Sequence, residues 1–115
     1  MLSFTHRFHG HGSLRYVYKN GQAVRSRLLT VKHVKNPHRK HSRFAVVVSK
    51  KVHKGAVGRN RIRRRIYEII REELSSFSGV NDIVVLVFSN EVITMPAHEL
   101  KESLRQLFSQ AGLYK

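Results

Sequence analysis

Apolar positions divide the first half of the chain into a short helix followed by two strands. Residues 13–20 carry apolar or aromatic side chains at i, i+3 and i+4, which predicts a helix that Ser13 caps and Gly21 terminates. These side chains are Leu14, Val17 and Tyr18. Residues 27–35 alternate between apolar and polar positions, as a strand with one buried face does. Residues 44–49 are almost continuously apolar, which is typical of a strand buried on both faces.

The second half predicts a helix, a strand and another helix. A basic, glycine-marked loop at 50–58 leads into a helix at 59–75, which is followed by a strand at 82–88 and a helix between Pro96 and Gly112. Two apolar stripes at helical spacing support the two helices. They consist of Ile62, Ile66, Ile69 and Ile70 in the first helix, and of Leu100, Leu104, Leu107 and Phe108 in the second.

The order α-β-β-α-β-α predicts an α+β fold in which helices pack on a small mixed sheet in two layers. A chain of 115 residues has the size of one domain, so we expect residues 1–115 to fold as a single unit. Residues 1–12 show no periodicity and are predicted to form an irregular arm.

Charge is distributed unevenly along the chain. The formal net charge is +15, and all seven acidic residues follow position 67, so residues 1–67 carry 18 Lys and Arg residues and no carboxylate. Mixed signs would serve solubility equally well. A polyanion explains the segregation better, because each phosphate contact releases counterions. The pattern therefore favours a nucleic acid over an acidic membrane or an acidic protein as the partner.

Several other classes of protein fit the sequence poorly. The absence of cysteine excludes disulfides, thiolate metal sites and a cysteine nucleophile. No apolar run approaches the roughly 18 residues of a membrane span, and the N-terminus has no signal-peptide features. We therefore expect a soluble, cytoplasmic protein with no membrane partner and no small-molecule substrate. Its scattered acids do not supply a two-metal nuclease, and His6, His9 and His11 lack a carboxylate or cysteine to complete a metal site.

The helix predicted at 59–75 turns its basic residues away from its isoleucines. One flank has no acidic neighbour at helical spacing. It consists of Arg59, Asn60, Arg63 and Arg64. Arg61 and Arg65 lie farther round, where Arg65 can pair with Glu68 at i, i+3. Because a guanidinium donates two parallel hydrogen bonds to a phosphate, the first flank predicts RNA contact. The second flank is equally compatible with a solvated, salt-bridged face.

The run SKKVHKGAVGRNRIRRRIYE resembles the signature of the bacterial ribonuclease P protein family, whose arginine-asparagine-arginine motif opens the central helix. The resemblance continues more weakly through YVYKNG, LTVKHVK, FAVVVSKK, NDIVVLVF and LKESLRQLFSQAGLYK. The chain departs from the family pattern at Tyr67, where a basic residue is usual, and at Leu14, where an aromatic residue is usual. His53 corresponds to a one-residue insertion.

The resemblance implies a fold like that of certain ribosomal protein domains, with a left-handed β-α-β crossover. It also implies a protein subunit of ribonuclease P, the ribonucleoprotein that removes the 5′ leader from precursor tRNA. The partners would be the catalytic RNA and precursor tRNA. Hydrolysis would be carried by the RNA subunit with Mg²⁺, which the RNA mainly holds.

Two sets of site residues follow from the resemblance. The residues implied to bind the RNA subunit are Lys54, Arg59, Asn60, Arg61, Arg63, Arg64 and Arg65. The residues implied to hold the single-stranded leader, in a cleft between the first helix and the sheet, are Leu14, Tyr18, Lys32, Ser49, Lys51 and Tyr114. No residue of the protein is implied to be catalytic or to bind metal directly, and Asn60 is a candidate for outer-sphere contact with a metal held by RNA. Tyr18 could instead be a core aromatic, and Tyr114 part of a frayed terminus.

Two other functions remain open from the residues alone. A ribosomal or other structural RNA-binding protein would have the same charge and tolerate the same fold, but it would have no need of an aromatic leader cleft. A nucleoid-type DNA-binding protein would require a dimeric or minor-groove device, which the sequence does not indicate.

Overall fold

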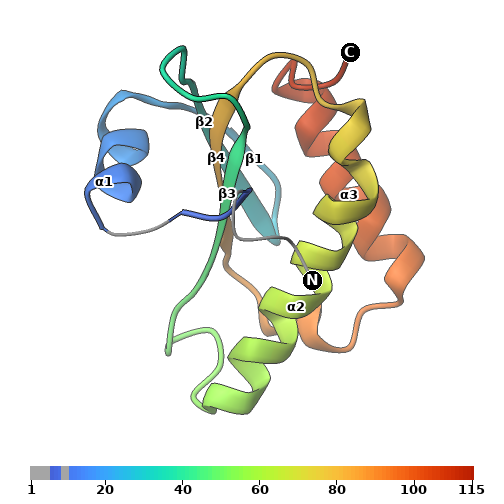
Figure 1. Ribbon diagram of the computed structural model, residues 1–115. Coiled ribbons are helices and arrows are strands. Elements are labelled where there is room, and N and C mark those ends of the chain that lie inside the picture. The colour runs from blue at the N-terminus through green and yellow to red at the C-terminus, as the bar shows by residue number, and fades with distance from the viewer. Residues whose placement is uncertain (1–5, 9–10) are drawn as a thin grey trace.

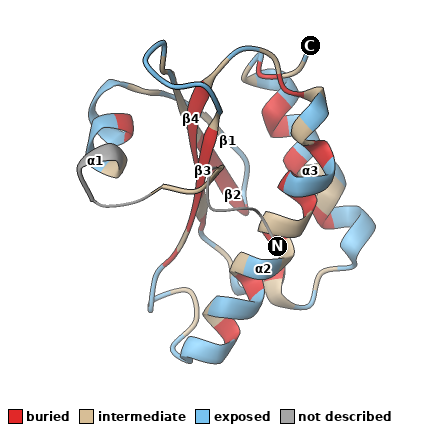
Figure 2. Cartoon of the chain, viewed as in Figure 1, coloured by how far each residue is buried: buried red, intermediate tan, exposed pale blue. Residues whose placement is uncertain are grey.

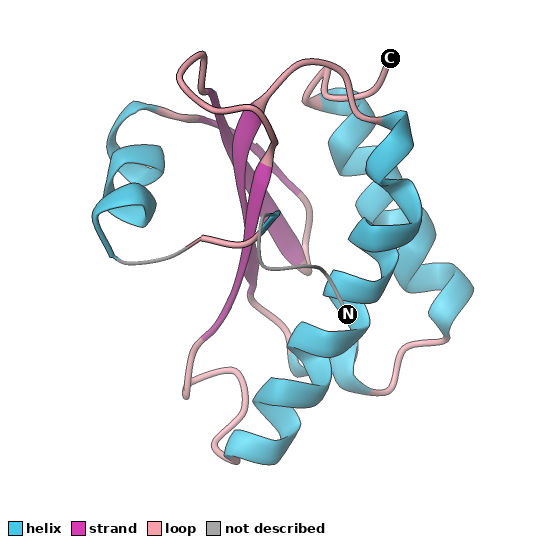
Figure 3. Cartoon of the chain, viewed as in Figure 1, coloured by secondary structure: helices cyan, strands magenta, loops and turns pink. Residues whose placement is uncertain are grey.

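Four strands form a single mixed sheet in the order β1-β2-β4-β3 (Figures 1 and 3). The computed structural model describes residues 6–8 and 11–115, apart from the side chains of 11–13. The strands are β1 Gln22–Arg25, β2 Leu29–Lys35, β3 Arg43–Val48 and β4 Asn81–Val87. Strand β2 is antiparallel to both β1 and β4, whereas β3 is parallel to β4.

Three α-helices and two short 3₁₀ helices complete the described fold. They are α1 His11–Asn20, α2 Ala56–Glu73, η2 Leu74–Ser76, η3 Asn90–Ile93 and α3 Ala97–Gln110. Figure 1 shows α2 and α3 on one face of the sheet and α1 on the opposite face. Strands β3 and β4, the first half of β2 and the inward sides of α2 and α3 are largely buried (Figure 2), so the main core lies between the sheet and these two helices.

The predicted α+β class, the mixed sheet and the six predicted elements are confirmed, with differences at their edges. Strand β1 was not predicted, because its four residues are mostly exposed and carry no apolar alternation. Helix α2 begins at Ala56, three residues before the predicted start at Arg59. Helix α1 adds a partial third layer to the two that were predicted (Figure 1).

The predicted N-terminal arm, residues 1–12, is described only in part. Arg7 forms a parallel bridge with Phe44, and the backbone N–H of Phe8 donates to the carbonyl of Phe44 at 3.3 Å, so this segment lies along the edge strand β3. Helix α1 begins at His11, so the prediction that Ser13 caps it is wrong. The remainder of the arm lies outside the described residues.

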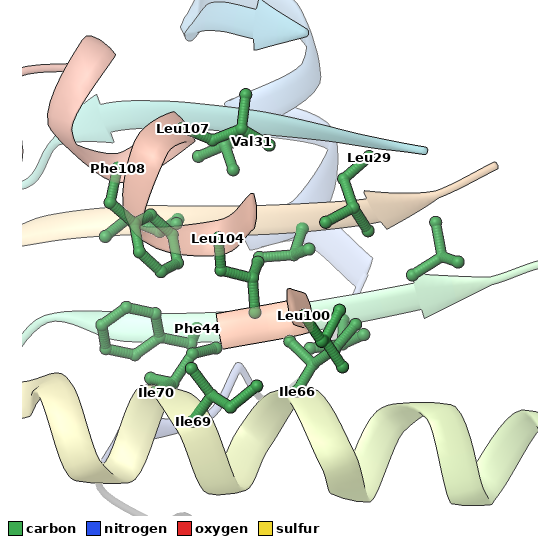
Figure 4. Packing of buried hydrophobic residues seen from close by; sticks show 14 of the residues in the cluster. Leu29, Val31, Phe44, Ile66, Ile69, Ile70, Leu100, Leu104, Leu107 and Phe108 are labelled. Atoms are coloured by element: carbon green, nitrogen blue, oxygen red, sulfur yellow. The ribbon is translucent and has the colours of Figure 1, made fainter. Parts of the chain in front are cut away.

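The isoleucine stripe of α2 and the leucine stripe of α3 meet over the sheet. Ile62, Ile66 and Ile70 are fully buried, and so are Leu100 and Leu104. Figure 4 shows Ile66 and Ile70 of α2 and the leucines of α3 converging on Phe44 of β3 and on the neighbouring strands. Burial of a side chain of this size contributes about 1.5–3 kcal/mol to the free energy of unfolding. The stripe therefore fixes the orientation of α2 about its own axis. The basic residues of α2 consequently point away from the core.

A smaller apolar cluster attaches α1 to the other face of the sheet. It consists of Val17, Ala45 and Val84, with partly buried side chains around them. Gly21 ends α1, as predicted, but its φ is not positive. A Cβ at this position would lie 2.6 Å from the carbonyl oxygen of Val17 and 2.9 Å from that of His33. Glycine is therefore required because the end of the helix lies directly against β2.

The connection from β3 through α2 to β4 is left-handed, as the family resemblance implied (Figures 1 and 4). Parallel strands are joined by right-handed connections in the great majority of proteins. Here Arg43, the first residue of β3, lies opposite Asp82, the second residue of β4. The two side chains form a buried ion pair. The Arg43 Nε donates to Asp82 Oδ1 at 3.0 Å and its Nη2 donates to Oδ2 at 2.8 Å. Asn36 Nδ2 donates to the same Oδ2 at 2.9 Å, and the Phe8 ring lies 4.9 Å from the guanidinium carbon.

Replacing Asp82 with asparagine should destabilise the protein strongly. The variant leaves the Arg43 guanidinium buried without a counter-charge, which costs about 3–5 kcal/mol in comparable sites. Glu91→Gln is the matched control, because the Arg27–Glu91 pair has the same chemistry at 3.0 Å but is exposed. The control should cost less than about 1 kcal/mol. Urea unfolding midpoints measure both, and equal midpoints for the two variants would show that the buried pair is not a determinant of stability.

Candidate RNA-binding surfaces

The outward side of α2 and the loop before it form a basic surface, here called the arginine surface. It consists of Lys54, Arg59, Asn60, Arg61, Arg63, Arg64 and Arg65. Lys54, Arg61 and Arg64 are exposed. The first turn of α2 has no acidic residue and no side-chain cap, so its backbone N–H groups add to the positive potential. The sequence prediction that these basic residues lie outside the core is confirmed for this helix.

A hollow of about 400 Å³ opens on the arginine surface. Its lining consists of Arg7, Asn60, Arg63, Arg64 and Tyr67. Asn60 Oδ1 accepts a hydrogen bond from Arg63, which fixes the orientation of the amide. The Tyr67 hydroxyl accepts from the backbone N–H of Val46 at 3.2 Å, and its ring lies 5.9 Å from the Arg7 guanidinium carbon. Three guanidiniums around one hollow suit a phosphate oxygen better than a bare cation.

Arg7 was not among the predicted site residues. It lies more than fifty positions before Arg63 and Arg64, so no helical spacing connects it with them. The bridge between Arg7 and Phe44 places it there. Only the bare charge of Arg7 in a carboxylate-free segment could have indicated this role.

Arg59 fastens the preceding loop to α2. Its Nη1 donates to the carbonyl of His53 at 3.0 Å and to that of Lys54 at 2.6 Å. The His53 ring packs against Gly58, where an added Cβ would lie 2.2 Å from the ring and would displace it. The predicted insertion residue His53 therefore shapes the loop, and Arg59 serves the loop as well as the surface.

Arg65 has a different environment from the one predicted. Its guanidinium donates to the carbonyls of Val92 at 2.6 Å and Ile93 at 3.0 Å, and also to that of Met95. Glu68 instead pairs with Arg71, whose hydrogen bond lowers the pKa of Glu68 to about 2. The predicted Arg65–Glu68 pair is wrong, because the end of η3 presents its unsatisfied carbonyls within reach of Arg65. The guanidinium thus ties α2 to the segment between β4 and α3.

The described carboxylates that form ion pairs do so away from the arginine surface. Asp82 pairs with Arg43 and Glu91 with Arg27, while three glutamates of α2 pair within the second half of the chain. The latter pairs are Glu68–Arg71, Glu72–Lys101 and Glu73–Arg105. Among the described residues, no carboxylate pairs with an arginine between positions 59 and 65. This surface therefore keeps its charge for an external anion.

The second predicted surface lies on the sheet face that α1 partly covers, here called the α1 face. Tyr18 projects from α1 with 38% of its surface exposed, and Lys32 Nζ lies 5.1 Å from the centre of its ring. Burial of the hydroxyl raises the pKa of Tyr18 above its ordinary value. Tyr18 is outside both described apolar clusters, so the alternative of a core aromatic is not supported. An aromatic ring beside a lysine is the pairing that single-stranded RNA binds.

The other predicted leader residues are spread along this face. Leu14 is half-buried and packs against the cluster of Val17, Ala45 and Val84. Ser49 follows β3, is exposed, and continues the alternation of Ala45 and Val47 on this face. Lys51 is exposed in the loop beyond it, whose turn closes with hydrogen bonds from Val52 and His53 to the Ser49 carbonyl. Tyr18, Lys32 and Ser49 therefore share a face.

Tyr114 does not lie with them, because the structure places it outside the predicted cleft between α1 and the sheet. It packs against Phe77 and Phe108 on the α2/α3 side of the sheet, with ring centres 5.3 Å and 6.0 Å away. A bridge to Phe77 and a hydrogen bond from Lys115 to the Ser76 carbonyl hold the C-terminus, which is not frayed. Burial, and then the nearby Glu73 carboxylate, raise the pKa of Tyr114 to about 12. Long-range packing of this kind leaves no signal in the local sequence.

The described residues contain no group of three or more histidine or acidic side chains that could hold a metal ion. The His6 Nδ1–H donates to the Ser42 carbonyl at 3.0 Å, and the His6 ring contacts His41. His9 and the side chain of His11 lie outside the described residues. No described helix is long and apolar enough to cross a membrane.

Fold and surfaces together define a small, basic α+β protein with two separate faces suited to RNA. The sequence profile of the Ribonuclease P family matches residues 2–112, and the chain belongs to this family.

Curated relatives and solved structures agree with this assignment. The ribonuclease P protein component of Synechocystis sp. is 35% identical over 84% of this chain and 77% of its own length. That of Pseudanabaena sp. is 33% identical over 96% and 95%. The RNase P protein of Staphylococcus aureus superposes with a TM-score of 0.85 at 27% identity, covering 96% of this chain and 98% of its own. That of Thermotoga maritima, at 23% identity and a TM-score of 0.80, has the same fold.

Alanine variants of Arg65 and Arg64 should distinguish an arginine that stabilises the fold from one that binds RNA. Arg65→Ala removes the donor of three carbonyls and should cost about 1–3 kcal/mol of stability. Arg64→Ala is the matched variant on the exposed side, and it should leave stability within about 0.5 kcal/mol. It should instead weaken binding to a bacterial ribonuclease P RNA and lower the slope of log affinity against log salt by about one. An Arg65 variant with unchanged unfolding and weakened RNA binding would place Arg65 among the RNA contacts.

Proposed function

We propose that this chain is the protein subunit of a bacterial ribonuclease P, which binds the catalytic RNA through the arginine surface and the 5′ leader of precursor tRNA on the α1 face. The observation that carries the proposal is the presence of two chemically different RNA-binding faces on one small domain. One offers several guanidiniums around a hollow, and the other offers a half-exposed tyrosine beside a lysine. The loop that carries Ser49 and Lys51 connects β3 of the sheet to α2, the helix of the arginine surface.

The chemistry of the arginine surface suits a folded RNA. Guanidiniums bind phosphates and read no sequence, so they position the protein on the RNA backbone. The exposed Arg61 and Arg64, with the hollow beside Asn60, supply these contacts in the proposal. Arg65 and Arg59 contribute mainly by holding the surface in shape, since their guanidiniums bind backbone carbonyls.

The α1 face suits a single strand. Its unstacked bases can lie on Tyr18 while Lys32 and Lys51 attract the backbone, an arrangement that tolerates any leader sequence. Mature tRNA has no leader, so this face would distinguish precursor from product. Leu14 supports the face by packing under α1, and Tyr114 has no part in the proposed leader contact.

Hydrolysis in this proposal is carried by Mg²⁺ held by the RNA subunit. The described residues offer no carboxylate cluster for metal ions, and the guanidiniums around Asn60 favour an anion. The Asn60 oxygen already accepts from Arg63, and its remaining lone pair is the one available to a water of a hydrated ion held by RNA. The proposal places this work in the cytoplasm, where bacterial tRNA precursors are made.

Reconstitution tests the function directly. The purified protein alone should release no leader from precursor tRNA at any Mg²⁺ concentration. Mixed with a bacterial ribonuclease P RNA, it should lower the Mg²⁺ concentration at which that RNA cleaves, because its guanidiniums replace part of the counterion demand. Leader release is measured on gels over a Mg²⁺ series. Cleavage by RNA-free protein, or an unchanged Mg²⁺ requirement with the RNA, would refute the proposed division of labour.

Tyr18→Ala should weaken the binding of precursor tRNA to the reconstituted enzyme by about ten- to a hundredfold, because a base–aromatic contact is lost. Mature tRNA should bind as before. Tyr16→Ala is the matched control, since Tyr16 is the more exposed tyrosine of α1 and lies two positions away on another side of the helix. Tyr18→Phe should retain most of the affinity. Equal weakening for precursor and mature tRNA would remove Tyr18 from the leader site.

A further inference from the structure

Phe88 is the most exposed aromatic residue among the described large hydrophobic side chains, with 60% of its surface accessible. It follows β4 directly and continues the alternation of Val84 and Leu86, which places it on the α1 face. Its backbone N–H donates to the Leu28 carbonyl at 2.9 Å, so its position is fixed by the sheet. Neither the sequence prediction nor the proposed leader contacts use this ring.

The surroundings of Phe88 are basic. A hollow of about 380 Å³ lies beside the ring, and Arg25, Arg27, Lys32 and Leu86 contribute to its lining. Arg25 is opposite Thr30 across β1 and β2, and Thr30 is opposite Leu86 across β2 and β4, so these side chains form one row on the α1 face. Arg25 is exposed and pairs with no carboxylate among the described residues. The Arg27–Glu91 pair is exposed and therefore weak.

Lys32 is common to this hollow and to the Tyr18 position. This lysine lies over the Tyr18 ring and also lines the hollow beside Phe88. Lys32 is opposite Val84, and Phe88 lies four positions after Val84 along the same strand direction. At the rise of a strand the two positions are about 13 Å apart. The cluster that seats α1 involves Val84, whereas Phe88 at the other end of this track is open to solvent.

We infer that Phe88, with Arg25 and Lys32, forms a second nucleotide-binding subsite on the α1 face, where a further base of the single-stranded leader stacks on the ring and the cations hold the adjoining phosphates. A chain of net charge +15 attracts polyanions, and an aromatic platform among arginines and lysines matches single-stranded RNA rather than an apolar protein surface. This subsite rests on the proposed leader-binding function. In this inference the leader contacts two aromatic rings, Tyr18 and Phe88, instead of Tyr18 alone.

The test uses the reconstituted enzyme and precursor tRNAs whose leaders lengthen one nucleotide at a time. Wild-type affinity should rise in two steps, one as the leader reaches Tyr18 and another as it reaches Phe88. Phe88→Ala should remove only one step, with a loss of roughly 5- to 150-fold for leaders that reach the subsite. Leaders that do not reach it, and mature tRNA, should bind as to wild type. Phe88→Leu keeps apolar bulk without a ring and should behave like the alanine variant, whereas Phe88→Tyr should restore the step.

The outcomes separate this inference from the function on which it rests. If wild-type enzyme binds precursor and mature tRNA equally, the proposed function itself fails. If wild type distinguishes them and Tyr18→Ala weakens precursor binding, but Phe88→Ala and Phe88→Leu bind every leader as wild type does, the subsite is refuted and the function stands. Equal weakening of precursor and mature tRNA by Phe88→Ala, or a rescue by leucine, would instead assign the ring to the RNA subunit or to an apolar partner. Melting curves for each variant confirm that the fold is intact.

Discussion

The buried pair of Arg43 and Asp82 fixes the alignment on which both RNA-binding faces depend. It joins the first residue of β3 to the second residue of β4, and its two hydrogen bonds favour this one register. In that register Phe44 and Val46 face α2 and α3, and Ala45 and Val47 face α1. A slip of one residue would exchange the two faces and bury the wrong set of side chains. The ion pair is thus a constraint on register more than a source of net stability.

With the register fixed, the isoleucine stripe decides where the charges of α2 point. Because the stripe is buried along the whole helix, the arginines between positions 59 and 65 are left at its margins or outside. The carboxylates of the second half of the chain form their pairs elsewhere in the fold. The uneven charge that is visible along the sequence therefore becomes an uneven charge in space. Had the acids been distributed among the arginines, local pairs would have neutralised the same surface.

The sequence predicted the features of the fold that depend on the local spacing of apolar and polar residues. The apolar stripes of α2 and α3, the continuous burial of β3 and the outward direction of the α2 arginines all follow from spacing alone. The errors in the candidate site concern groups whose partners are remote in the chain. Arg65 binds carbonyls about thirty positions away, and Tyr114 packs on Phe77. Arg7 reaches α2 only through a bridge to β3. In each case a tertiary contact determined the role, and the spacing of neighbours carried no trace of it.

Affinity and selectivity place different demands on a protein of this charge. Phosphate contacts give strong, salt-dependent attraction to any RNA, so the arginine surface by itself cannot distinguish a precursor tRNA from its product. Selection requires groups that only an unstacked strand can satisfy, and rings on an open sheet face meet that requirement. In the proposed function the domain therefore needs both faces, with α1 covering only part of the sheet. A longer α1 would bury more apolar area and stabilise the fold, but it would also cover the face on which a single strand could lie.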